Sequence, residues 1–112
     1  MQMTVDTSAD GITTIKLSGR LDTAGSQEVE LRFSAVTGAH RAVIVDLSGV
    51  EFLTSLGIRL LLQGAKTVRS KGGKLALLQP RELVQNVLKT AGVEAMVPVL
   101  QGQAAAIAAV SP

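Results

Sequence analysis

The sequence predicts an α/β fold: a single mixed β-sheet of four to five strands with about four helices packed against it. Short β-branched or continuously apolar segments alternate along the chain with segments whose apolar residues recur at helical spacing. Strands that are joined through helices pair in parallel, through right-handed crossovers. A chain of 112 residues holds one hydrophobic core and is too short for two, so we expect residues 1–112 to form a single domain.

The first elements expected along the chain are a hairpin and a helix. Residues 3–7 (MTVDT) and 12–18 (ITTIKLS) are β-branched and partly alternating, and the turn-forming SADG separates them. Residues 19–25 break the strand pattern. The stretch SQEVELRFSAVTG that follows has apolar residues at helical spacing, so we expect a helix there, with Asp22 or Thr23 as its cap.

A buried strand and a leucine-rich helix form the centre of the chain. Residues 41–49 (RAVIVDLSG) are apolar up to an acid, which is typical of a strand buried on both faces and places Asp46 at its C-terminal end, bonded to turn amides. After the short VEF, the helix is expected over roughly 55–70. Its core side is predicted to hold Ile58, Leu61, Leu62, Ala65 and Val68.

Two leucines of this helix, Leu56 and Leu60, fall on the predicted solvent side. They are either surface residues that a terminal helix covers, or part of a protein-binding surface beside Ser55. Gly57 and Gly64 share a flank of the helix. Glycine costs about 1 kcal/mol relative to alanine inside a helix, so both positions indicate a close approach of another segment.

The rest of the chain predicts two more strands and two more helices. Residues 75–79 (LALLQ) read as a buried strand, and a helix is expected from Pro80 until Gly92. The stretch VEAMVPVL then suggests a short strand interrupted by Pro98, and QAAAIAAV suggests a terminal helix made of strong helix formers.

The composition excludes several functional classes. Cysteine is absent and His40 is the single histidine, so we expect no catalytic residue, no metal site and no bound cofactor. A net charge of +2, no Trp or Tyr and only two Phe argue against nucleic-acid binding. The apolar runs are shorter than the roughly 18 to 20 residues of a membrane span, and the N-terminus has no secretion signal. We therefore expect a cytoplasmic protein without direct membrane insertion.

Ser55 stands at the start of the leucine-rich helix and has three interpretations. It can cap the helix, which is worth about 1 kcal/mol. It can act as a nucleophile, although the chain offers only His40 as a base. It can also accept a phosphate, because unpaired amides and the positive end of the helix dipole favour an anion there. Around it, bonds to turn amides explain Asp46 better than a role in the site does, whereas capping and a role in the site explain Asp22 about equally well. Arg69, Lys71 and Lys74 are explained as solvated surface.

Two stretches carry a family resemblance. GRLDT at 19–23, and VIVDLSGVEFLTSLGIRLLLQGAK at 43–66 followed by GGKLALL, resemble STAS domains, specifically the bacterial anti-sigma factor antagonists. In that family the phosphorylated serine lies in an Asp-Ser-Ser-Gly segment, which Thr54, Ser55, Leu56 and Gly57 match here. The resemblance implies phosphorylation at Ser55, and it places Asp22 near that serine, where it helps to engage the partner kinase.

The resemblance implies a non-enzymatic switch. The unphosphorylated protein would bind an anti-sigma factor serine kinase, and a separate serine phosphatase would act on the phosphorylated form. The expected partner-binding residues are Asp22, Thr23, Thr54, Ser55, Leu56, Gly57 and Leu60.

This sequence departs from the family pattern at two positions, where Thr54 replaces the aspartate and Leu56 replaces the second serine. Thr54 is then an alternative phosphate acceptor. The departures also leave open a second hypothesis: an unmodified STAS adaptor subunit of a larger assembly, such as a lipid or anion transporter.

Overall fold

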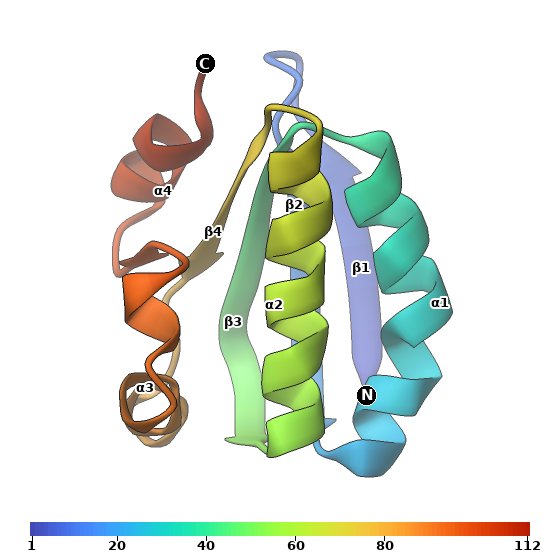
Figure 1. The fold of residues 1–112 in the computed structure, drawn as a ribbon, viewed down its shortest axis with the longest axis vertical. Helices are drawn as coiled ribbons and strands as arrows, with labels where there is room; N and C mark the ends of the chain where they lie inside the picture. Colours follow the sequence, from blue (N-terminus) through green and yellow to red (C-terminus); the bar gives the residue numbers. More distant parts are fainter.

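The computed structural model describes residues 1–112 and contains one mixed sheet of five strands in the order β1-β2-β3-β4-β5 (Figure 1). Only the β1–β2 hairpin is antiparallel, and β2 to β5 run parallel. The strands are β1 (Gln2–Thr7), β2 (Thr13–Leu21), β3 (Ala42–Leu53), β4 (Lys74–Leu78) and β5 (Val99–Leu100). The predicted fold class, a single mixed sheet of four to five strands with about four helices, is confirmed.

The helices lie on both faces of this sheet. They are α1 (Thr23–Ala39), α2 (Ser55–Ser70), α3 (Glu82–Thr90) and α4 (Gln103–Val110), with a short 3-10 turn at Val93–Ala95. In Figure 1, α1 and α2 run side by side in front of the sheet, and α3 and α4 lie beyond β3 and β4. No helix combines the length and the apolar character that crossing a membrane requires.

Alternation along the buried strands separates two cores. Val43 and Val45 on β3 belong to a main core of 21 buried residues that also takes side chains from α1, α2 and α3. Ile44, between them, faces the other way into a smaller core with Ala106 and Val110 of α4. Helix α4 therefore covers the opposite face of the sheet from α1 and α2, and it does not lie over Leu56 and Leu60.

Both parallel strands that lead to the site are longer than the sequence predicted. β2 continues through Gly19 to Leu21, and β3 continues through VEF to Leu53. The register between these strands shifts twice along the ladder, and Gly19 takes a φ of +111°, which glycine adopts without strain. These irregularities account for the broken pattern that indicated a loop.

Asp46 consequently lies inside β3 and not at its end, so its predicted position is wrong. Its carboxylate accepts the backbone amide of Ser48 at 2.9 Å, beside the first register shift. The predicted bond to nearby amides is thus present, but it stabilises an irregular strand and not a turn. β3 continues to Leu53 before α2 begins at Ser55, so Asp46 and Ser48 lie away from the start of that helix.

The predicted close approaches at two glycines of α2 are confirmed. A Cβ atom at Gly64 would lie 2.5 Å from the Phe33 ring of α1, and a Cβ atom at Gly57 would lie 2.5 Å from the Leu21 carbonyl oxygen. The absence of side chains lets α2 pack directly on α1 and on the end of β2.

At the far end of α1, Lys71 donates hydrogen bonds to the carbonyl oxygens of Thr37 (2.7 Å) and His40 (3.0 Å). Lys71 is therefore not the simply solvated residue that the sequence predicted.

Candidate functional site

The candidate site is built where two parallel strands end side by side and each leads directly into a helix. Leu21, the last residue of β2, pairs with Leu53, the last residue of β3. Asp22 then caps α1 and Thr54 occupies the N-cap position of α2. Thr54 donates its amide to the Leu21 carbonyl oxygen at 3.2 Å, and its hydroxyl reaches the same oxygen at 3.4 Å. Two helix N-termini are therefore held next to each other at one edge of the sheet.

Asp22 caps α1, as one of the two predicted alternatives, and its carboxylate also contacts Arg20. One oxygen accepts the Gly25 amide at 2.8 Å, and the other lies 3.4 Å from the Arg20 side chain. The Gly25 hydrogen bond, with help from Arg20, lowers the pKa of Asp22 below its ordinary value, although desolvation opposes this. The Arg20 guanidinium lies 4.5 Å from the centre of the Phe52 ring. The site therefore carries the negative charge of Asp22, which contacts the Arg20 guanidinium that lies over the Phe52 ring.

Ser55 is the first residue of α2 and is exposed to solvent. Its capping interpretation is wrong, because Thr54 holds the N-cap position and directs its hydroxyl to β2. The Ser55 hydroxyl makes no hydrogen bond within the chain, so it is free to react or to bind. His40 follows the C-terminal end of α1, whereas Ser55 lies beside the N-terminal end, so the histidine is not positioned as its base.

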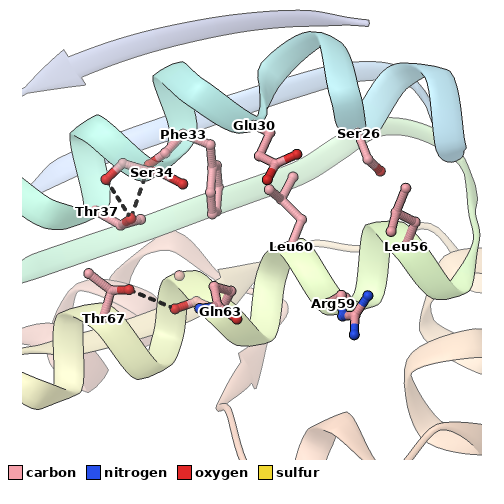
Figure 2. A pocket seen from close by; sticks show the side chains of 11 residues that line it. Ser26, Glu30, Phe33, Ser34, Thr37, Leu56, Arg59, Leu60, Gln63 and Thr67 are labelled. Carbon is pink, nitrogen blue, oxygen red and sulfur yellow. Dashed lines mark hydrogen bonds between the residues drawn. The ribbon is translucent and has the colours of Figure 1, made fainter.

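Leu56 and Leu60 turn toward α1 and not toward open solvent. Figure 2 shows both side chains pointing across the gap between the helices, toward Ser26 and Glu30. Leu60 is 8% exposed and belongs to the main core, and Leu56 is half-buried. The predicted exposure of Leu60 is wrong because α1 packs along this side of α2, which the period of α2 alone does not reveal.

An apolar groove that the sequence did not reveal lies on the other flank of α2, between α2 and α3. It is lined by Ile58, Leu83, Asn86, Val87, Thr90 and Ala91. Leu83 is 58% exposed, and Ile58 and Val87 are only half-buried. Ile58 lies one turn after Ser55, so the groove begins beside the serine. The sequence predicted that Ile58 and Leu62 face the core. Both are only half-buried, because α3 spans just nine residues and does not cover them completely.

The site contains no assembly of metal ligands. No group of three or more histidine or acidic side chains lies close enough together to hold an ion anywhere in the structure. What the arrangement offers instead is an unpartnered hydroxyl at a helix start, a neighbouring carboxylate, and apolar surface on the adjoining flank. The hydroxyl and the carboxylate are both accessible to solvent at this end of the sheet.

The chain is a small domain with a five-stranded mixed sheet and two helix starts side by side, and the comparisons with known proteins identify its class. The chain belongs to the STAS domain family, whose model matches residues 4–106. Two of its relatives are named anti-sigma factor antagonists, as the resemblance in the sequence predicted.

BtrV of Bordetella bronchiseptica, named as an anti-sigma factor antagonist, is 31% identical over 110 residues, which cover 97% of this chain and 94% of that protein. The anti-sigma F factor antagonist of Paenibacillus polymyxa is 23% identical over 99 residues, covering 87% and 85% of the two chains. The solved structure of an anti-sigma-factor antagonist (STAS) domain protein from Planctomyces limnophilus superposes with a TM-score of 0.84 at 26% identity, and covers 97% of both chains.

Proposed function

We propose that this protein is a non-enzymatic switch: unphosphorylated, it binds an anti-sigma factor serine kinase, and phosphorylation at Ser55 ends that binding. The observation that carries the proposal is the exposed, unpartnered hydroxyl of Ser55 at the first position of α2. The kinase would transfer the γ-phosphoryl group of ATP to the Ser55 oxygen and release ADP. A separate serine phosphatase would restore the hydroxyl by hydrolysis.

The position of Ser55 allows a phosphate to be added without unfolding the domain. The amides of the first turn of α2 have no partners within the helix, and the dipole favours negative charge there. A phosphate brings about −1.5 to −2 charges at neutral pH. A partner that buries this edge would have to desolvate those charges beside the apolar Ile58 and the ionised Asp22, so the complex would be lost while the fold remains.

The structure divides the proposed contact residues into two groups. Asp22, Thr23, Thr54, Ser55 and the half-buried Leu56 are accessible at the edge of the sheet, and they would touch the partner. Gly57 and Leu60 are buried, so they would act through the position of α2. We add the exposed Leu83 and the half-buried Ile58 as apolar contacts, because their groove continues from Ser55.

The first test combines phosphosite mapping with a pair of substitutions at Ser55. Mass spectrometry of the protein isolated from its own cells should find phosphate on Ser55, and Thr54→Val should not remove it. Ser55→Ala should bind a purified kinase-type anti-sigma factor from the same organism as the unsubstituted protein does, and Ser55→Asp should bind at least tenfold more weakly. Ser70→Asp, at the opposite end of α2, provides the control for added charge.

Two results would contradict the proposal. Phosphate on Thr54 alone would move the switch to the neighbouring residue. Equal binding of the Ser55→Ala and Ser55→Asp variants, with no phosphate under any growth condition, would favour the unmodified adaptor of a transporter assembly.

The apolar groove makes a separate prediction about the contact surface. Leu83→Ser should weaken binding of the anti-sigma factor about tenfold, because full burial of a leucine is worth about 1.5–3 kcal/mol and only the exposed 58% of Leu83 remains to be buried. Leu31→Ser is the matched control, since Leu31 is 86% exposed on α1. Equal affinities of the two variants in isothermal titration calorimetry would exclude the groove from the interface.

A further inference from the structure

A cavity of about 350 Å³ lies between α1 and α2, apart from the apolar groove on the other flank of α2. Its apolar wall consists of Phe33 from α1 and Leu56 and Leu60 from α2. Most of the remaining lining is polar, and this volume lies within the range of about 300–1,000 Å³ that is usual for small-molecule sites. Figure 2 shows side chains from both helices turned into the same space.

Ser26 points into this cavity and has no partner. Its side chain extends from α1 toward Leu56 in Figure 2. The residue is 2% exposed, and its hydroxyl oxygen is the one buried side-chain polar atom in the structure without a hydrogen bond. A buried hydroxyl without a partner is costly, so it indicates that another polar group occupies the space in front of it. Thr37 at the other end of the cavity already donates to the carbonyl oxygen of Phe33 at 3.0 Å.

Opposite charges stand on the two walls at the exposed side of the cavity. Glu30 comes from α1 and Arg59 from α2, and both are exposed. They do not pair with each other, because the two ion pairs of the structure join Glu28 to the N-terminus and Arg20 to Asp22. Figure 2 shows the Glu30 carboxylate turned toward Leu60, whereas the Arg59 guanidinium lies on the side of α2 away from α1. Because the Arg59 side chain is exposed, a change of rotamer would bring its guanidinium to a ligand between the helices.

We propose that this cavity binds a small zwitterion of the α-amino-acid class. The ligand carboxylate pairs with Arg59, whose planar guanidinium suits a carboxylate, and the ligand ammonium pairs with Glu30. An apolar side chain packs against Leu56, Leu60 and Phe33. The ligand's polar end also supplies the partner that the buried hydroxyl of Ser26 lacks.

Titration of the ¹⁵N-labelled protein with L-leucine tests this assignment without any protein partner. Two further probes each lack one charge: 3-methylbutylamine has no carboxylate, and 4-methylpentanoate has no ammonium. We expect saturable shifts of the α1 and α2 amides around the cavity with leucine. We expect binding of either half-ligand to be weaker by up to about fivefold, because an ion pair with an exposed side chain is worth up to about 1 kcal/mol.

Substitutions locate the binding. Arg59→Gln and Glu30→Gln should each weaken leucine binding by up to about fivefold, and Lys66→Gln, an exposed position of α2 outside the cavity, should leave it unchanged. Ser26→Ala should also weaken binding, with its amide spectrum as the check on folding. The assignment is overturned if leucine causes no saturable shifts, if either half-ligand binds equally well, or if the charge variants bind as Lys66→Gln does. None of these readouts depends on the anti-sigma factor or on Ser55.

Discussion

Replacement of Gly57 by alanine would place a methyl group where α2 rests on the end of β2. An ideal Cβ atom there would lie 2.5 Å from the Leu21 carbonyl oxygen and 2.8 Å from a methyl carbon of Leu53. The carbonyl cannot easily retreat, because it accepts the Thr54 amide at 3.2 Å and ends a paired strand. We therefore expect Gly57→Ala to push α2 away from β2.

Gly38→Ala is the matched control for this change. Gly38 lies near the end of α1, and a Cβ atom there would meet nothing within 4 Å. Glycine to alanine in a helix ordinarily stabilises by up to about 1 kcal/mol, so the control should gain part of this. Overpacking costs about 1–3 kcal/mol, which at Gly57 outweighs the gain from helix propensity. The difference between the free energies of unfolding of the two variants should therefore be about 1–3 kcal/mol.

Urea unfolding followed by far-ultraviolet circular dichroism measures both free energies under the same conditions. The Gly57→Ala variant should unfold at a lower urea concentration than the unsubstituted protein, and the Gly38→Ala variant at an equal or higher one. Equal stabilisation by the two substitutions would refute the claim that α2 is in direct backbone contact with β2. The same variant should also bind the proposed partner more weakly, since the start of α2 moves.

Two further predictions concern the ends of α1. Asp22 has a lowered pKa in the folded protein, so its contribution to stability is complete above its unfolded pKa of about 4 and is lost as the pH falls through the lower folded value. Asp22→Asn should reduce the loss of stability below pH 4, measured by urea midpoints, and an unchanged pH profile would contradict the assigned charge. Lys71→Met should lower the free energy of unfolding by about 1–2 kcal/mol, because the carbonyl oxygens of Thr37 and His40 lose their donor. Lys66→Met, at an exposed position, should have no comparable effect in the same assay.

Local patterns were sufficient to predict the helices and the sheet. Residues 55–70 and 103–110 were predicted as helices and are helical over those ranges, because apolar periodicity in one and alanine propensity in the other agree with the fold. The C-terminal end of β3 was not predictable in this way. Its apolar run pauses at Asp46 and Gly49, and the partner strand β2 is needed to show that pairing resumes beyond the irregularity.

The sequence indicated the polar residues of the candidate site but not which apolar residues around them are exposed. Ser55 and Asp22 could be found from short motifs, since each lies at the start of a helix. The roles of Leu60 and Ile58 could not, because the period of one helix defines its faces but not which neighbour covers each of them. Helix α1 buries Leu60, whereas α3 leaves Ile58 half-exposed. The buried hydroxyl of Ser26 gave no local signal, since a serine early in a helix is common.

The hydrogen bond from Thr54 to Leu21 joins residues that are 33 positions apart in the chain. The segment between Leu21 and Thr54, which contains α1 and β3, must therefore fold back before the starts of α1 and α2 lie together. Closing this loop costs chain entropy. A folding intermediate that has formed the hairpin and isolated helices would have Ser55 but no neighbouring Asp22, and it would present no surface for a kinase to recognise. Under the proposed function, Ser55 would become a substrate only after this loop has closed, so the proposed kinase would select complete domains over partly folded chains.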